Sequence, residues 1–294
     1  MLQNFKRGGI FMKVILRKSD SATSLLLFIY NNCITQYNKD TLKLSSLLEI
    51  MKAFGKSETA TRMSLSRTVK AGILINKTDG REVHYSLAPS GREAINIWNE
   101  GIHQFWKRYT LRNKTWDKKW HLLNLNFGEE NKENRPVVLE RLQQIGFGVL
   151  GTNTWITPYC QTNDIQNILT EFNMNTGVVE MYGELTIYQD MYSFVESVFH
   201  LKELEKLYKN FINTFSEKFE EIKKIYQEEW FIGGGKALPL LHSLGWEFFN
   251  IASEDVMLPK ALYPEWEGDE AAQLMLEFRS ILLESTIKYL KKYE

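Results

Sequence analysis

Hydrophobic and polar residues recur along residues 57–71 with the period of an α-helix, and they separate into two faces. One face is small and partly apolar, and it consists of Thr61, Ser64, Leu65, Thr68 and Val69. The other face is polar and consists of Arg62, Met63, Ser66, Arg67 and Lys70. Ser57 can cap the start of this helix, and Gly72 offers the left-handed residue that commonly ends one. The pattern predicts a helix with one packed face and one exposed cationic face.

Two β-rich runs follow this helix directly, at residues 73–77 and 83–87. They are joined through Asp79-Gly80, and an Asp-Gly pair between such runs is a strong signal for a β-hairpin. The basic residues near its tip are Lys77, Arg81 and His84. A basic helix followed by a hairpin is typical of a winged helix-turn-helix, in which cationic side chains reach phosphate oxygens and guanine edges. The alternative interpretation is a solvated helix and an ordinary hairpin.

Two further helices are expected upstream, at residues 21–30 and 44–54. Ser46 and Glu49 make a capping box in the second of them, and residues 54–56 predict the tight turn of the helix-turn-helix. After the hairpin, residues 92–108 predict a long helix whose apolar positions gather near one face. This long helix fits a dimerisation or linker role, and it fits packing against its own domain equally well.

Residues 116–187 alternate in the β-α-β-β-α-β order of a ferredoxin-like domain. The expected strands are residues 121–127, 147–150, 154–157 and 177–187. The expected helices are residues 135–145, with Pro136 in the first turn, and residues 164–173. The remaining residues, 188–294, are predicted to be mainly helical, with a loop at Gly233-Gly234-Gly235 and a last helix at residues 270–289.

Together these elements predict an α+β fold in five segments. They are a flexible N-terminal arm (1–20, with Met12 as an alternative start), a winged helix-turn-helix DNA-binding domain (21–90), a linker helix (91–115), a ferredoxin-like domain (116–187) and a helical C-terminal domain (188–294). The chain is long enough for several domains, each with a core of its own.

Charge is distributed unevenly along the chain. The net charge of the whole is zero, but residues 1–121 carry 21 Lys and Arg against 9 Asp and Glu, and residues 122–294 carry 15 against 27. A basic half gains affinity for DNA by releasing its counterions, whereas an acidic half repels DNA and is expected to face away from it. The alternative is chance segregation of charge on a neutral enzyme.

Other classes of function find little support in the sequence. No apolar run approaches the roughly 18 residues of a membrane span, and the start of the chain has no apolar signal region, so we expect a cytoplasmic protein without a membrane partner. Cys33, Cys160 and the five histidines form no cluster with metal-ligand spacing, so neither a metal nor another cofactor is expected. The strand expected at residues 121–127 ends without the acidic residue that a metal-dependent nuclease needs. We therefore predict no enzymatic activity.

Three sets of residues occur in an order and spacing that are typical of one family. The N-terminal set includes Phe54-Gly55, Arg62, Ser66-Arg67, Gly72, Gly80-Arg81 and Tyr85. The central set includes Trp116, Trp120, Arg135, Gly146-Phe147-Gly148 and Trp155-Ile156. The C-terminal set includes Leu240-Leu241-His242, Asp255, Leu258-Pro259, Leu262-Tyr263-Pro264, Trp266 and Gly268. With these sets the chain resembles the PaaX family of bacterial repressors, named for the control of phenylacetate catabolism, over roughly residues 21–285.

The chain also departs from the pattern of the family. It has Thr61 and Thr68 where the family usually has apolar residues, and Val256 and Glu267 where the family has proline. Residues 244–246 stand where the family has arginines after Leu-Leu-His. The last difference bears on the ligand site.

The resemblance implies a homodimeric repressor on a palindromic DNA operator, with a Cas2-like central domain and a helical C-terminal domain. The residues expected to contact DNA are Arg62, Met63, Ser66, Arg67, Lys70, Lys77, Arg81 and His84. The resemblance also implies that the effector is an aryl-CoA thioester, typically phenylacetyl-CoA, which releases the repressor from DNA. The alternative is an acyl-CoA-binding or acyl-CoA-processing protein whose winged domain serves protein interaction.

A CoA thioester brings phosphates and an apolar acyl group, so its pocket needs cations and aromatic walls. The candidates by residue type are Trp116, Lys118, Lys119, Trp120 and Arg135, with His242 from the last region. The alternative interpretation assigns the tryptophans to a domain core, the lysines to solvent and His242 to the packing of a helix.

Overall fold

The computed structural model of the chain describes residues 21–174 and 176–293. The flexible arm predicted at residues 1–20 lies outside them. Contacts divide the described residues into two compact units. The winged unit holds residues 21–99, 211–248 and 272–293, and the ferredoxin-like unit holds the remainder. This division cuts across the five segments expected from the sequence, because residues after 188 contribute to both units.

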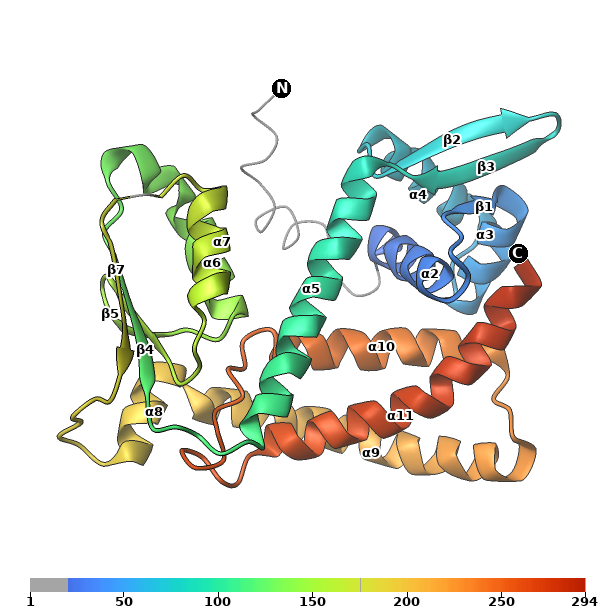
Figure 1. The fold of residues 1–294 in the computed structure, drawn as a ribbon. Helices are drawn as coiled ribbons and strands as arrows, with labels where there is room; N and C mark the ends of the chain where they lie inside the picture. Colours follow the sequence, from blue (N-terminus) through green and yellow to red (C-terminus); the bar gives the residue numbers. More distant parts are fainter. Residues whose placement is uncertain (1–20, 175, 294) are drawn as a thin grey trace. The chain divides into compact units, whose positions relative to one another are not determined.

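The winged unit begins with three helices and a small sheet (Figure 1). The elements are α2 (Ala22–Tyr37), β1 (Thr41–Lys43), α3 (Leu44–Ala53), α4 (Glu58–Lys70), β2 (Leu74–Asp79) and β3 (Glu82–Leu87). The antiparallel sheet has the order β1-β3-β2. This order of helices and strands is that of a winged helix-turn-helix, as the sequence predicts.

Local signals place the ends of α4 and of the hairpin. The Ser57 hydroxyl accepts a hydrogen bond from the Ala60 amide at 3.2 Å and so caps the start of α4. After the end of α4, Gly72 has a left-handed backbone conformation, with φ 72°. The hairpin turn consists of Gly80, with φ 59°, and Arg81. The turn is thus one residue later than predicted, because Asp79 still pairs with Glu82 in the ladder.

The capping box predicted at Ser46 and Glu49 is wrong. Helix α3 begins at Leu44, with Lys43 as the capping residue and no side-chain cap, so Ser46 lies inside the helix. Glu49 instead forms an ion pair with Lys52, whose Nζ lies 2.7 Å from the Glu49 carboxylate. The reason is that β1 pairs with β3 up to Lys43, and this pairing sets where the helix can start.

C-terminal helices complete the core of the winged unit. Leu238 from α10 (Gly234–Ala252) and Leu290 from α11 (Glu267–Leu290) are buried in the same cluster as Leu26, Ile50 and Leu65. The Tyr37 hydroxyl also donates to the main-chain carbonyl of Ile287. The winged helix-turn-helix and the C-terminal helices therefore share one hydrophobic core.

The long helix after the hairpin is α5 (Pro89–Arg112), and its apolar positions are used within the chain. Ile95 is buried in the core of the winged unit. Phe105 is buried in the ferredoxin-like unit, where its ring lies 6.4 Å from the ring of Phe249. The first part of α5 thus packs within the winged unit and its later part within the ferredoxin-like unit. The dimerisation or linker role and packing against its own domain both stay predictions.

The ferredoxin-like unit contains a four-stranded antiparallel sheet of order β5-β6-β4-β7. Its elements are β4 (Trp120–Leu125), η2 (Glu129–Asn134), α6 (Arg135–Gln144), β5 (Gly148–Gly151), β6 (Thr154–Thr157), α7 (Thr162–Glu171) and β7 (Val178–Gly183). The sheet packs on α6 and α7 through a core that includes Leu123, Val138, Trp155 and Ile165. This is the predicted β-α-β-β-α-β arrangement, and the α+β fold class is confirmed. The last strand ends at Gly183, four residues before the predicted end.

Helices account for most of the chain after Asp190. They are α8 (Met191–Phe199), α9 (Leu201–Glu229), α10 and α11, followed by the short 3-10 helix η3 (Lys291–Tyr293). The loop predicted at Gly233-Gly234-Gly235 is mostly helix, because α10 begins at Gly234. Within the described residues, no helix combines the length and hydropathy needed to cross a membrane.

Candidate nucleic-acid interface

Helix α4 has the two faces that the sequence predicts. Thr61, Leu65 and Thr68 are buried against the winged unit, with Leu65 completely inaccessible. The opposite face is exposed to solvent along its whole length, and its residues are Arg62, Met63, Ser66, Arg67 and Lys70. The cationic face is therefore free to meet a partner.

Two threonines on the packing face account for a departure from the family pattern. The Thr61 hydroxyl donates to the Ser57 carbonyl at 2.9 Å, and the Thr68 hydroxyl donates to the Ser64 carbonyl at 2.6 Å. Each hydroxyl thus bonds the backbone one turn earlier, which satisfies a buried polar group inside the helix. Threonine can stand here in place of an apolar residue without leaving an unpaired hydroxyl.

The cations on the exposed face of α4 have no acidic partner among the described residues, unlike Lys43 and Arg92 of the same unit. Among the described residues, no ion pair or hydrogen bond involves the side chain of Arg62, Arg67 or Lys70. By contrast, Lys52 pairs with Glu49 at 2.7 Å and with Glu58 at 3.5 Å. The exposed face of α4 therefore presents uncompensated positive charge, which is what an interface with phosphates requires.

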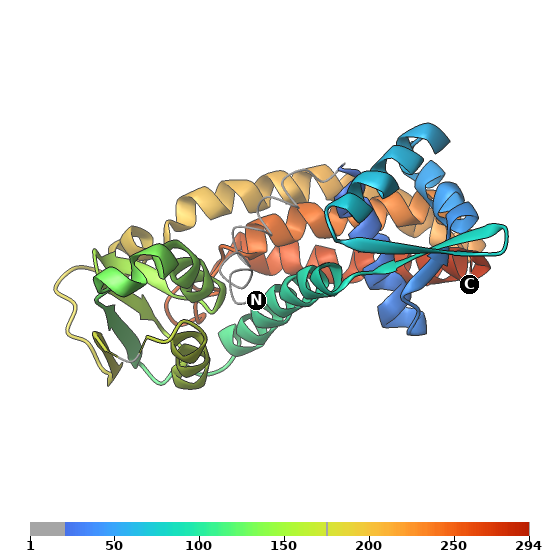
Figure 2. The same ribbon diagram turned by 90° about the horizontal axis from the view of Figure 1, so that it is seen from above.

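The wing adds two more exposed cations. Figures 1 and 2 show α4 leading into the base of the β2–β3 hairpin, which extends beyond it. Lys77 and Arg81 are exposed near its tip, and neither forms an ion pair with another described residue. His84 is less available, because it lies on β3 with its Nε2 3.7 Å from the carboxylate of Glu82, to which Lys43 donates at 3.1 Å.

Eight residues were predicted to contact DNA. Seven of them are exposed and form no ion pair with another described residue, and they lie in two groups, on α4 and at the wing tip. His84 is set back between charged neighbours. That these residues contact DNA stays a prediction.

The residues predicted to bind a CoA ligand do not come together in one place. Trp116, Lys118, Lys119 and Trp120 precede or begin β4. Arg135 lies beyond the other end of β4, where its guanidinium donates to the Thr152 carbonyl at 3.4 Å. Because six residues of strand span roughly 17 Å, these groups lie at opposite ends of the sheet. His242 belongs to the winged unit.

The tryptophans of this set have packing roles. Trp120 is 1% exposed, and its ring meets Phe194 edge-on at 5.6 Å. The Trp116 indole donates to the carbonyls of Lys119 and Pro158, at 3.1 and 3.2 Å, and so closes the loop in front of β4. Exposed Lys119 lies over the ring of Tyr182, 5.8 Å from its centre.

His242 is enclosed by aromatic rings in the winged unit. The ring centres of Phe28, Phe54 and Trp246 lie 4.8, 5.8 and 6.0 Å from the imidazole centre. Burial lowers the pKa of His242 to about 4, so the imidazole is neutral at pH 7. Phe54 is in the turn that precedes α4, so His242 connects α10 to the turn of the helix-turn-helix. These contacts fit the helix-packing interpretation. Contact of His242 with a ligand stays an untested prediction.

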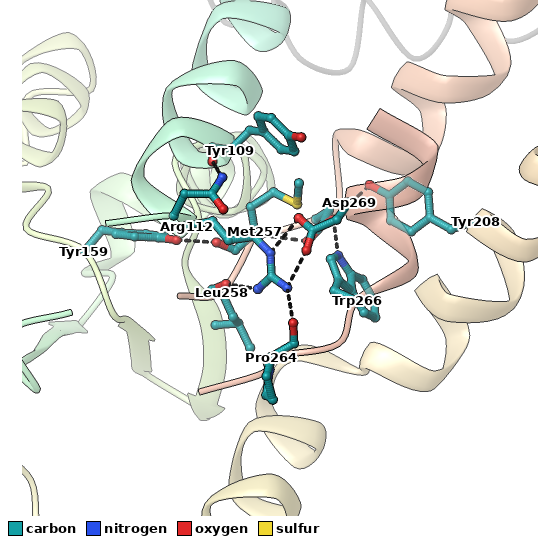
Figure 3. A network of polar contacts seen from close by, with 11 residues as sticks. Tyr109, Arg112, Tyr159, Tyr208, Met257, Leu258, Pro264, Trp266 and Asp269 are labelled. Carbon is teal, nitrogen blue, oxygen red and sulfur yellow. Dashed lines mark hydrogen bonds and ion pairs between the residues drawn. The ribbon is translucent and has the colours of Figure 1, made fainter. Parts of the chain in front are cut away.

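Two buried arginines of α5 were missed by the sequence reasoning. Arg112 is 0% exposed, and its guanidinium binds both carboxylate oxygens of Asp269 at 2.8 Å and the main-chain carbonyls of Leu258 and Pro264 (Figure 3). Arg108 donates to the carbonyls of Gln144 and Asp255. Both arginines follow Phe105 at helical spacing and so continue the apolar stripe of α5, and this was the available signal.

Asp255, whose carbonyl accepts from Arg108, is the centre of an adjoining set of hydrogen bonds. Its carboxylate accepts hydrogen bonds from the Tyr208 hydroxyl at 2.8 Å, the Trp266 indole at 3.0 Å and the Met257 amide at 2.7 Å. Burial raises the pKa of this carboxyl, whereas these donors and nearby Arg108 act to lower it. The Tyr208 hydroxyl, the Trp266 indole and the Met257 amide thus hold the turn after α10 through one carboxylate.

The described residues contain no group of three or more histidine, cysteine, aspartate or glutamate side chains placed to hold a metal ion.

A winged helix-turn-helix followed by a ferredoxin-like domain and long helices defines the class of this protein by its fold. The family model described as "PaaX-like protein" matches residues 21–91, and that described as "PaaX protein central Cas2-like domain" matches residues 113–191. Together they match about half of the chain. The chain therefore belongs to the PaaX family, a family of transcriptional regulators.

The fold is also similar to a solved structure, that of the uncharacterized protein Rv0674 from Mycobacterium tuberculosis. The TM-score is 0.58 at 15% sequence identity, and the match covers 92% of this chain and 99% of the other. At this identity the likeness concerns the fold alone. No curated protein matches the chain.

Proposed function

We propose that this protein is a cytoplasmic, DNA-binding transcriptional repressor that leaves its operator when an aryl-CoA thioester binds. The observation that carries the proposal is the exposed face of α4, on which Arg62, Arg67 and Lys70 have no acidic partner among the described residues. Membership of a regulator family supports the same function.

Docking of α4 in the major groove follows from its shape and charge. The groove admits one α-helix, and a recognition helix contacts base edges mainly with its N-terminal half. Arginine can form two hydrogen bonds with guanine, and lysine can pair with phosphate oxygens. In this arrangement Lys77 and Arg81 of the wing reach the backbone or the minor groove, and a homodimer reads the two halves of a palindrome.

The effector acts by linkage. A ligand weakens DNA binding only if it binds the DNA-incompetent arrangement better than the competent one. We propose phenylacetyl-CoA or a related acyl-CoA for this role. The six candidate residues named above for its site do not come together in one place, so the proposal leaves its pocket unassigned.

The test of DNA binding compares two variants of the full chain. Arg67→Ala removes a free cation of α4, and Lys52→Ala removes a cation of α3 that is already paired with Glu49. In mobility-shift titrations at fixed salt with a duplex selected from a random-sequence library, Arg67→Ala should weaken binding by roughly 1–3 kcal/mol if Arg67 reads a base. Lys52→Ala should change it little. Equal affinity of Arg67→Ala and the wild type would reject the role of Arg67.

The effector is tested on the preformed complex with DNA. Phenylacetyl-CoA is titrated into it, with free CoA and phenylacetate as separate controls. Release by the thioester and not by the controls is the expected result. If no aryl-CoA ester releases DNA, the effector part of the proposal fails. A protein that binds acyl-CoA but shows no salt-dependent affinity for DNA would fit an acyl-CoA-binding or acyl-CoA-processing role instead.

A further inference from the structure

Met63 has an unusual position on the cationic face of α4. Its side chain is 51% exposed, although it is large and apolar. With about 100° between successive residues of a helix, Met63 lies within roughly 20° of the direction opposite to the buried residues Thr61, Leu65 and Thr68. Met63 is therefore among the residues that point most directly away from the core.

The neighbours of Met63 place it between hydrogen-bonding groups. Arg62 and Arg67 flank the outermost line of the helix on its two sides, and Ser66 lies one turn further along. Met63 is also in the N-terminal half of α4, the half of a recognition helix that meets base edges. If α4 enters the major groove, the flanking arginines reach toward its walls and Met63 points toward its floor.

The floor of the major groove carries one apolar group, the C5-methyl of thymine, beside the donors and acceptors of the base edges. A thioether placed against donors or acceptors would remove them from water without a hydrogen bond in return, which is unfavourable. Placed against a methyl group, the same side chain removes apolar surface of both partners from water.

We propose that Met63 determines specificity by packing against the C5-methyl group of a thymine in each operator half-site. The proposal rests on the proposed function, since it requires α4 to dock in the major groove. It adds which base α4 selects at one position and by which chemistry.

The test uses deoxyuridine, which lacks only this methyl group. In the duplex selected by the full chain, thymines are replaced by deoxyuridine one symmetric pair at a time, and affinity is measured at fixed salt. At one symmetric pair of positions, the wild type should bind the deoxyuridine duplex more weakly than the thymine duplex, by about fourfold for each methyl group lost. Met63→Gln, similar in length but polar, should bind the thymine and deoxyuridine duplexes equally at that position. Met63→Leu should keep the preference for thymine.

A matched control separates this effect from general loss of binding. Lys70→Gln removes a charge near the same outward line, so it should weaken binding to both duplexes alike and keep the thymine preference. The proposal is overturned if no thymine shows a penalty in the wild type, or if the penalty persists in Met63→Gln. Neither result contradicts the proposed function, provided that the affinity of the wild type for the selected duplex falls steeply with salt concentration.

Discussion

Replacing His242 with phenylalanine tests the packing of α10 against the turn before α4. In the wild type the imidazole lies among Phe28, Phe54 and Trp246, and burial alone accounts for its low pKa. Protonation would place a charge among aromatic rings, with no carboxylate partner in the part of the chain that the structure describes. Protonation of His242 should therefore be unfavourable in the folded chain, and lowering the pH should decrease the free energy of unfolding.

The magnitude follows from the two pKa values of His242. The pKa is about 4 in the folded chain and 6.5 for an unperturbed histidine. The unfolded state therefore binds more protons between these values, so the contribution to stability is complete above pH 6.5 and is lost as the pH falls toward 4. The expected loss is about 2 kcal/mol at pH 5 and about 3 kcal/mol at pH 4.

The assay is urea unfolding of the full chain at pH 7 and pH 5, for the wild type and two variants. His242→Phe should lose about 2 kcal/mol less than the wild type between these pH values, whatever its stability at pH 7. His103→Phe makes the same substitution at an exposed site of α5 and should behave as the wild type. If the free energy of unfolding falls by the same amount in the wild type and in His242→Phe between pH 7 and pH 5, then His242 is not held in its neutral form by burial.

Two further predictions concern the buried network and the cap of α4. Arg112→Met leaves Asp269 and two carbonyls without their donor, so it should lower the free energy of unfolding by about 3 kcal/mol, and a negligible loss in urea unfolding would contradict its role. Ser57→Ala removes the cap of α4 and should cost about 1 kcal/mol, whereas Ser57→Thr should cost less; equal losses would show that the hydroxyl does not cap the helix.

The features of the winged unit that sequence reasoning predicted are local ones. Ser57, Gly72 and Gly80 act within a few residues of themselves, through a cap, a helix end and a tight turn. The two faces of α4 follow from its helical period. The capping box at Ser46 failed because the pairing of β1 with β3, a longer-range contact, decided where α3 begins.

The contacts between distant segments were not predicted. Leu238 and Leu290 enter the core of the winged unit from roughly 170 to 260 residues further along the chain than Leu26, Ile50 and Leu65, and an apolar helix face does not reveal its partner. Burial of Arg112 was missed for a similar reason, since its acceptors come from residues 258–269. Residue type suggested a ligand site at Trp116 and Arg135, but only the sheet shows that they lie at opposite ends of β4.

The dependence of DNA binding on salt tests the central claim most directly, that the free cations of α4 face a duplex. For the wild type, the logarithm of the association constant should fall linearly with the logarithm of salt concentration, with a slope of about −0.9 for each phosphate contact. A variant with glutamine in place of Arg62, Arg67 and Lys70 should bind more weakly and with a shallower slope. An unchanged slope in this variant, or no salt dependence in the wild type, would contradict the account.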